Sequence, residues 1–458
     1  DEMGMPVMAE SFDSWAQAKV PNGYNPDFNE WHERDLTNLI HQFRNSPSVI
    51  MWSIGNEVPE QPSLEGAKLA YRLQESCHRE DPTRPVTNGM DNPLGVLKSG
   101  MAGTLDIPGF NYRPFLYDTA HKVLPQGFLL GSETCSTVSS RGVYKFPVVR
   151  KSMAKYPDHQ SSGYDVEHCG WSNLPEDDFI RQEDLSWSMG EFIWTGIDYL
   201  GEPTPYYSEW PSHSSLFGAI DLAGIPKDRF YLYRSHWNKG AETLHILPHW
   251  TWPGREGQVT PIFVYTNHPE AELFINGKSQ GRQKKDTSIT IDATENKESQ
   301  EAFTRQKRYR LMWMDTKYEP GEVKVVAYDK SGKAVAEQFV NKRARYDDAF
   351  VNIKIEIALP CLMGEVGGGD VFNCAAFQHC QYFFFLALQQ LGVEVRLQRV
   401  QRQVEGVQNQ VGGFIVRVVR AMPEKQTGIV ETADGETQDV ADGGQFLGCL
   451  GKHIHQNP

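Results

Sequence analysis

The stretch Met51-Trp52-Ser53-Ile54-Gly55-Asn56-Glu57 decides the fold. It is mostly apolar up to Ile54 and ends in Gly-Asn-Glu, the pattern of a short buried strand that presents a carboxylate at its end. In a β/α barrel the chemistry takes place at the carboxyl ends of the strands, so Glu57 is a candidate catalytic residue. The alternative is that Gly55 and Asn56 form an ordinary turn and that Glu57 is a solvated loop residue.

A second stretch repeats this pattern. Gly127-Phe128-Leu129-Leu130-Gly131-Ser132-Glu133 is again an apolar strand that ends in a glutamate. Glycoside hydrolysis needs two such carboxyl groups: one stays protonated to give its proton to the leaving oxygen, and the other stays ionised to attack or stabilise the sugar cation. The sequence therefore predicts that Glu57 and Glu133 act as a pair.

With a third motif, Gly190-Glu191-Phe192-Ile193-Trp194-Thr195-Gly196, the chain resembles glycoside hydrolase family 2, the family of β-galactosidases and β-glucuronidases. Trp52–Glu57 is similar to the acid/base motif of this family, and Gly131–Glu133 is similar to its nucleophile segment. The third motif is similar to the last barrel strand. The resemblance covers roughly residues 1–345 and implies a retaining enzyme in which Glu57 is the general acid/base and Glu133 the nucleophile.

Further side chains are expected to bind substrate on this resemblance: Asn56, Tyr112, Trp194, Glu10 and Glu202. Asn56 would hydrogen-bond the sugar 2-hydroxyl, and the hydroxyl of Tyr112 would keep Glu133 ionised. Trp194 would form an apolar wall against the sugar face, with a buried barrel residue as the alternative. The two glutamates are weaker candidates that would accept hydrogen bonds from sugar hydroxyls.

Composition limits the remaining classes of function. The chain has 458 residues and a net charge of −14, which argues against a nucleic-acid surface. Its longest apolar run, Tyr382 to Leu388, is too short to cross a bilayer. The seven cysteines include no CxxC pair, so neither a zinc site nor a disulfide framework is indicated. We expect a glycoside or oligosaccharide partner and no cofactor, metal, nucleic acid or membrane, and we leave oligomerisation open.

Short strands alternate with amphipathic helices over residues 1–240, which predicts an α/β fold with a partial TIM-barrel catalytic domain. Strands are expected at Met5–Glu10, Ser48–Ser53, Pro85–Asn88, Leu105–Asn111, Gly127–Ser132 and Glu191–Thr195. Helices are expected at Phe28–Phe43, Ser63–Glu80 and Asp228–Asn238, the last with Phe230, Tyr231, Tyr233 and Trp237 packing inward.

On the resemblance, these strands are numbers three to eight of a (β/α)8 barrel, so the chain is expected to begin inside the barrel. A barrel closes only when its first strand pairs with its last. We therefore expect this chain alone to be inactive and to aggregate through its open edges. The location cannot be read from the sequence, although secretion or a periplasmic location is expected for a full-length protein.

From residue 241 the apolar period changes to two, and Asn276-Gly277 marks a hairpin turn. We predict an immunoglobulin-like β-sandwich over 241–345, in which Trp250 and Trp252 stack on sugar or pack between domains. A further β-domain is expected from 346, beginning with a strand at Ala349–Ile357. Residues 361–458 resemble no family, and a divergent domain, a disordered segment and a reading-frame artefact all stay open.

The identity of the sugar depends on an absent motif. Glucuronidases of the resembled family bind the substrate carboxylate through Asn-x-Lys after strand eight, and Ser214–Arg229 contains no such motif. A terminal β-galactoside is therefore the expected substrate, with a β-glucuronide or another β-glycoside as the alternative. The alternative from another class is an inactive carbohydrate-binding or scaffold remnant of a barrel.

Overall fold

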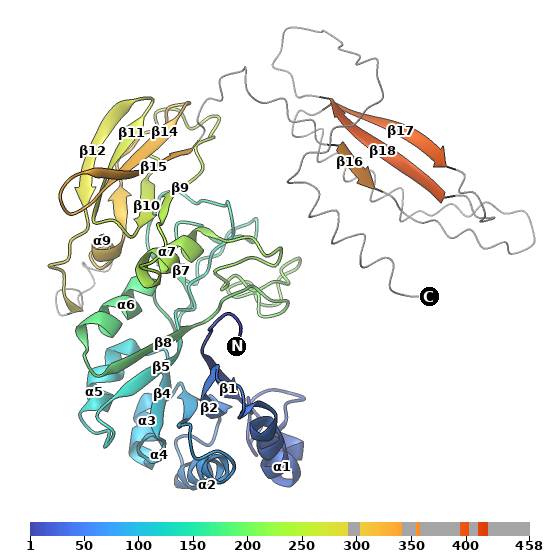
Figure 1. The fold of residues 1–458 in the computed structure, drawn as a ribbon, viewed down its shortest axis with the longest axis vertical. Helices are drawn as coiled ribbons and strands as arrows, with labels where there is room; N and C mark the ends of the chain where they lie inside the picture. The colour runs from blue at the N-terminus through green and yellow to red at the C-terminus, as the bar shows by residue number, and fades with distance from the viewer. Residues whose placement is uncertain (292–302, 341–353, 358–393, 403–410, 420–458) are drawn as a thin grey trace, which may run out of the picture. The chain divides into compact units, whose positions relative to one another are not determined.

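The computed structural model describes residues 1–291, 303–340, 354–357, 394–402 and 411–419. The chain forms two compact units, Asp1–Arg343 and Ala344–Pro458. The first unit contains a parallel sheet with its helices and, after it, two antiparallel sheets (Figure 1). Among the described residues no helix is both long and apolar enough to span a membrane.

A six-stranded parallel sheet forms the centre of the first unit. Its strands, in spatial order, are β1 (Val7–Glu10), β2 (Val49–Asn56), β3 (Val86–Met90), β4 (Ile107–Asn111), β5 (Leu129–Thr134) and β8 (Ser188–Ile193). Each strand pairs in parallel with its neighbour, which confirms the predicted partial TIM barrel. Strand β8 begins and ends earlier than predicted, so Trp194 follows the strand instead of lying within it.

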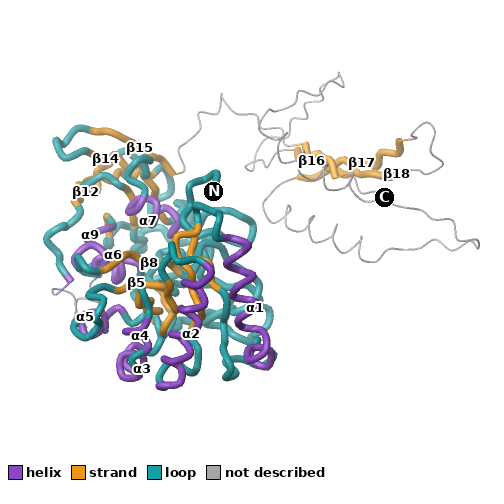
Figure 2. The backbone as a smooth tube through the Cα atoms, turned by 60° about the horizontal axis from the view of Figure 1, so that its bottom comes forward, coloured by secondary structure: helices purple, strands orange, loops and turns teal. Residues whose placement is uncertain are grey.

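Helices cover the sheet because each presents one apolar face to it. They are α1 (Asn25–Phe43), α2 (Leu64–Glu80), α3 (Pro93–Ser99), α4 (Met101–Thr104), η1 (Pro114–Leu116) and α5 (Tyr117–His121). Phe28, Leu36 and Ile40 are the buried residues of α1, and the Ser63 side chain caps α2 by accepting a hydrogen bond from the Gly66 N–H. Figure 2 shows α1 and α2 next to each other and beside the strands.

A long excursion separates β5 from β8 and contains β6 (Lys151–Ser152), β7 (Glu167–His168) and α6 (Pro175–Asp184). Helix α7 (Asp228–Trp237) follows β8 and matches the predicted closing helix. The inward packing predicted for Trp237 is only partial: its ring contacts the buried Phe179 and Tyr233, but the residue stays 48% exposed. Tyr233 is buried as predicted, and Phe230 and Tyr231 are half-buried.

Two antiparallel sheets follow and pack as a β-sandwich. One contains β13 (Leu311–Trp313), β10 (Ile262–Thr266) and β9 (Leu244–Leu247), and the other contains β12 (Lys278–Lys284), β11 (Glu270–Ile275), β14 (Val323–Tyr328) and β15 (Ala334–Val340). A short helix, α9 (Gln306–Tyr309), precedes β13. Val264 of the first sheet and Leu273 and Val325 of the second lie in one apolar core. The predicted β-sandwich is thus confirmed, whereas immunoglobulin-like connectivity and the domain limits at 240 and 345 stay predictions.

The sandwich also settles two local predictions. Asn276 and Gly277 join β11 to β12 with φ angles of +50° and +78°, as expected for the predicted hairpin turn. Trp250 is buried in the core of the sandwich, where its indole N–H donates to the Glu319 carbonyl. Trp252 packs against Phe146 of the excursion after β5, so packing rather than an open sugar platform accounts for both tryptophans.

The second unit contains three described strands, β16 (Lys354–Ile357), β17 (Glu394–Arg402) and β18 (Val411–Val419). They form one antiparallel sheet in the order β16-β18-β17. The strand predicted at Ala349–Ile357 falls partly outside the described residues, as does most of the stretch 361–458 that resembles no family.

Candidate active site

Parallel strand ends bring the two predicted glutamates to one edge of the sheet. Glu57 follows directly after β2, and Glu133 lies near the end of β5. The Cα of Glu133 is in register with that of Asn111, the last residue of β4. Because the strands are parallel, their carboxyl ends meet at the same edge, and both glutamates are presented there.

One amide group links the two carboxyl groups. Asn111 Nδ2 lies 2.8 Å from Asn56 Oδ1, 3.1 Å from Glu57 Oε1 and 3.4 Å from Glu133 Oε2. The last two distances share this nitrogen, so the two carboxylate oxygens are at most about 6.5 Å apart. Carboxyl groups of retaining glycosidases are about 5–5.5 Å apart, and those of inverting enzymes about 6.5–9.5 Å.

Tyr112 lies beside Glu133, where the sequence predicted it. Its hydroxyl donates a 2.6 Å hydrogen bond to Glu133 Oε1 and lies 2.6 Å from Ser136 Oγ. Its backbone N–H donates to the Glu133 carbonyl at 2.7 Å. Tyr112 has a φ of +57°, a left-handed conformation that few residues other than glycine adopt. The turn at the end of β4 thus directs the phenol toward the glutamate.

Glu57 also has a left-handed backbone, with a φ of +50°. Its N–H donates to the Gly89 carbonyl at 2.8 Å, which ties this turn to β3. Lys19 Nζ lies 3.9 Å from Glu57 Oε2 and forms a closer ion pair, at 2.8 Å, with Asp13. The Glu57 side chain is 24% exposed, so a molecule from solvent can reach its carboxyl group.

Asn56 and Glu10 flank Glu57. The Asn56 carbonyl oxygen Oδ1 accepts from Asn111, as described above, and its Nδ2 lies 3.4 Å from Asp13 Oδ1. Glu10 ends β1, and its carboxylate accepts a 2.7 Å hydrogen bond from the Ser53 hydroxyl. Both predicted residues therefore lie at the carboxyl ends of β1 and β2, next to the candidate pair.

Trp194 and Glu202 belong to a second group that extends from the end of β8. The Trp194 indole N–H donates to the Tyr199 hydroxyl at 3.2 Å, and that hydroxyl donates to the Glu202 carboxylate. The charge of Glu133 contributes to raising the pKa of Tyr199, after burial and Glu202, so this group lies within electrostatic range of the nucleophile candidate. Trp194 is half-buried, whereas Glu202 is exposed.

The charges at this edge are mostly negative. Burial first and neighbouring carboxylates second raise the pKa of both glutamates, and the resulting pKa of Glu133 is about 8. The Tyr112 hydroxyl and Lys19 lower the pKa of Glu133 but do not outweigh its burial. That Tyr112 keeps Glu133 ionised stays a prediction: its hydroxyl favours the ionised form, against the larger effect of burial.

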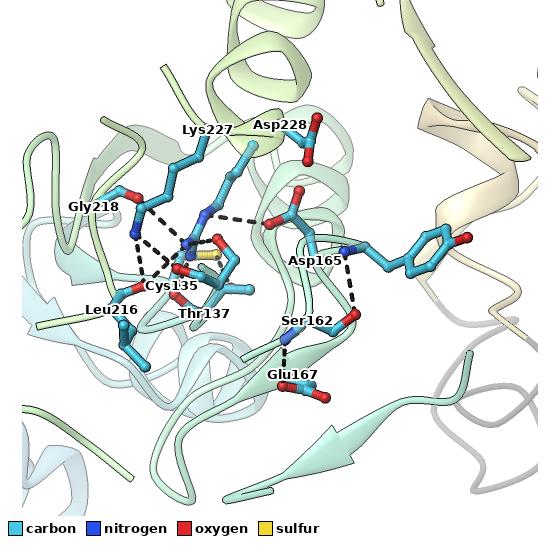
Figure 3. Close-up of polar contacts among 12 residues, drawn as sticks. Cys135, Thr137, Ser162, Asp165, Glu167, Leu216, Gly218, Lys227 and Asp228 are labelled. Carbon is cyan, nitrogen blue, oxygen red and sulfur yellow. Dashed lines mark hydrogen bonds and ion pairs between the residues drawn. The ribbon is translucent and has the colours of Figure 1, made fainter. Parts of the chain in front are cut away.

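Two buried cations hold the loops that follow β5 and β8. Lys227 Nζ donates to the carbonyls of Ser139 at 2.8 Å and Leu216 at 3.3 Å. Arg229 donates to the Thr137 carbonyl and, at 2.7 Å, to Ser139 Oγ. Figure 3 shows Lys227 directed toward Leu216 in this cluster. Both cations are almost fully buried, and their hydrogen bonds hold the backbone of these loops.

Sequence reasoning missed three residues of this site. Asn111 ends a buried strand in the same way as Asn56, so its position was a usable signal. Lys19 lies in the loop after β1, and nothing in its local sequence marks it. Gly89 on β3 leaves room for the two amides, because a Cβ there would lie 2.7 Å from Asn56 Oδ1 and 3.2 Å from Asn111 Nδ2. Such a role depends on strand register, which the sequence does not show.

The fold and the site define a β/α-barrel protein with a pair of carboxyl groups at its strand ends. A family model described as the TIM barrel domain of glycosyl hydrolases family 2 matches residues 1–107, and a domain of unknown function, DUF4982, matches residues 257–336. Beta-galactosidase BoGH2A of Bacteroides ovatus is 38% identical over 379 residues, which cover 74% of this chain and 41% of that protein.

Two further relatives agree with this assignment. A beta-glucuronidase of Bacteroides fragilis is 26% identical over 297 residues, covering 61% of this chain and 40% of that protein. The crystal structure of a beta-glycosidase from Bacteroides vulgatus superposes with a TM-score of 0.58 at 31% identity, covering 77% of this chain and 43% of the other. The chain belongs to glycoside hydrolase family 2, and it spans less than half the length of these relatives.

Proposed function

We propose that this chain carries the catalytic pair of a retaining β-glycosidase that acts on terminal β-galactosides. The observation that carries the proposal is the single Asn111 amide between Glu57 and Glu133, which keeps the two carboxylate oxygens within about 6.5 Å. That limit leaves room for direct attack on the sugar and little room for an intervening water. Membership of a glycoside hydrolase family supports the same reaction class.

In the proposed mechanism, the Glu133 carboxylate attacks the anomeric carbon while the bond from that carbon to the leaving oxygen breaks. Glu57 gives its proton to the leaving oxygen and becomes a carboxylate. In the second step Glu57 takes a proton from water, the water oxygen bonds to the anomeric carbon, and Glu133 leaves as a carboxylate. Two inversions give net retention of configuration.

The cations that follow β8 contact protein groups, which favours a neutral sugar over a uronic acid as the substrate. The segment Ser214–Arg229 lacks an Asn-x-Lys motif, and its two cations, Lys227 and Arg229, both contact protein groups. Lys227 forms an ion pair with Asp198 and is only 2% exposed. A β-glucuronide stays the second candidate because three relatives are named beta-glucuronidases or putative beta-glucuronidases, and because Lys19 lies near Glu57.

The test compares nitrophenyl β-galactoside with nitrophenyl β-glucuronide, using the protein expressed with all flanking sequence that its gene encodes. We expect hydrolysis of the galactoside, far slower release from the glucuronide, and a first-formed sugar of retained configuration by proton NMR. Equal or faster cleavage of the glucuronide would overturn the galactoside assignment. No release from either compound, with sugar binding still detected, would favour a non-catalytic carbohydrate-binding protein.

A further inference from the structure

Asn111 offers fewer hydrogens than there are acceptors around it. Its Nδ2 lies within 3.4 Å of Asn56 Oδ1, Glu57 Oε1 and Glu133 Oε2, and 2.8 Å from the first of these. An amide nitrogen carries two hydrogens. The three oxygens around it have no hydrogen of their own to donate when the carboxyl groups are ionised. If one hydrogen serves Asn56, only one is left for the two glutamates.

The orientation of the amide is fixed by the neighbouring strands. The Ser132 hydroxyl donates to Asn111 Oδ1 at 2.7 Å, so the oxygen faces Ser132 and the nitrogen faces the glutamates. Gly89 on β3 lacks the Cβ that would displace the amides of Asn56 and Asn111. Asn111 is 1% exposed, so water does not compete for its hydrogens. The nitrogen is therefore held between the two carboxyl groups.

We propose that Asn111 is a shared positioning residue whose remaining N–H donates to whichever of Glu57 and Glu133 carries the negative charge. This inference rests on the proposed function. In the first step the charge leaves Glu133, which becomes a neutral ester, and appears on Glu57, which has lost its proton. In the second step the charge returns to Glu133. A donor within reach of both carboxylates can stabilise each in turn, whereas Tyr112 contacts Glu133 alone.

The test measures each carboxyl group in the absence of the other. Glu57→Gln leaves Glu133 to titrate, and Glu133→Gln leaves Glu57, and each pKa is followed in the whole chain by NMR of [δ-13C]glutamate. Adding Asn111→Leu removes the donor and keeps the branching of the side chain at Cγ. We expect it to raise the remaining pKa by at least about half a pH unit in both backgrounds, because a hydrogen bond to the ionised form is lost.

Matched variants separate this role from a structural one. Tyr112→Phe should raise the pKa of Glu133 and leave that of Glu57 unchanged. Asn88 is an equally buried asparagine on β3 whose amide has no hydrogen-bond partner among the described residues, so Asn88→Leu should move neither pKa. If Asn111→Leu fails to fold, Gly89→Ala tests the same idea, because its Cβ displaces the amide while every polar group stays.

A shift in only one background would mean that Asn111 serves a single glutamate, and it would overturn the inference, as would no shift in either. The proposed function is tested separately, by mass spectrometry after incubation with 2-deoxy-2-fluoro-β-galactosyl fluoride. Failure to form an adduct on Glu133 would count against the proposed function, even where the titrations show a shared donor. An adduct together with unmoved pKa values would count against the shared donor alone.

Discussion

The Tyr112 hydroxyl donates to Glu133 Oε1 at 2.6 Å, and the two residues are also joined through their backbones. A donor to a carboxylate stabilises its ionised form and lowers its pKa. Here that effect works against burial, which raises the pKa of Glu133 to about 8. Tyr112 is therefore one of the groups that favour the ionised form of Glu133.

Tyr112→Phe should raise the pKa of Glu133 further and move the acidic limb of the pH–rate profile upward by about one unit. The proposed nucleophile must be ionised, so activity lost at neutral pH should return as the pH rises. The measurement is kcat/KM for an aryl galactoside against pH. Tyr117→Phe is the control, since it removes a buried hydroxyl with no hydrogen-bond partner in the described part of the chain. A limb that stays in place in Tyr112→Phe would contradict the assigned role.

The two glutamates should separate by mutation. Glu133→Gln should abolish turnover of every substrate, because no covalent intermediate can form. Glu57→Gln should slow substrates with poor leaving groups most and spare activated aryl glycosides, whose leaving groups need no proton, and azide should rescue the step that follows. The exposed Glu65→Gln serves as the control for loss of a carboxylate. Equal losses on good and poor leaving groups in Glu57→Gln would argue against its acid/base role.

The strand ends of this fold could be predicted from the sequence because apolar runs that end in Gly-Asn-Glu or Gly-Ser-Glu report burial and chain direction at once. The structure accordingly places Glu57 and Glu133 at one edge. The shift of β8 toward the N-terminus was not predictable in this way, since Gly190 and Gly196 bound an apolar run without marking which of its residues pair with β5. Trp194 consequently follows the strand.

The contacts between strands were beyond the sequence. Whether Asn111 reaches both glutamates depends on the register between β3 and β4 and on the absence of a Cβ at Gly89. Both matter only once the strands have packed together in the tertiary structure. The raised pKa of Glu133 depends on how many carboxylates share its surroundings, which only the packed sheet determines. Neither the contacts of Asn111 nor the pKa of Glu133 can be predicted from composition or hydrophobic periodicity.

Glu133→Gln should stabilise the folded chain, and by more at pH 8 than at pH 5. The folded pKa of Glu133, about 8, is above its ordinary value of 4.5, so its contribution to stability is complete below pH 4.5 and is lost as the pH rises toward 8. Glutamine resembles the protonated carboxyl and avoids that loss. We expect a gain of about 1–2 kcal/mol at pH 8, allowing for partial solvent exposure. Thermal unfolding of the parent and the variant at pH 5 and pH 8 measures this gain. An equal gain at both pH values would contradict a raised pKa of Glu133 as its cause.

Arg310 should be among the costliest residues to replace, because it joins the β-sandwich to the barrel through fully buried contacts. It pairs with Glu176 of α6 and donates to the backbone carbonyls of Tyr164 and Asp165 at 2.9 and 3.0 Å. Arg310→Met leaves Glu176 as a buried charge without this partner and should lower the free energy of unfolding by about 3–5 kcal/mol.

The double variant Arg310→Met/Glu176→Gln removes the unpaired charge as well, so it should recover part of that loss. Arg282→Met removes an arginine that is 40% exposed and pairs with Glu270, and its unfolding midpoint should stay close to that of the parent. Urea unfolding of the three variants measures these differences in stability. If the double variant is less stable than Arg310→Met, the cost comes from lost packing and carbonyl contacts rather than from an uncompensated carboxylate, and the buried pair is not what holds the sandwich against the barrel.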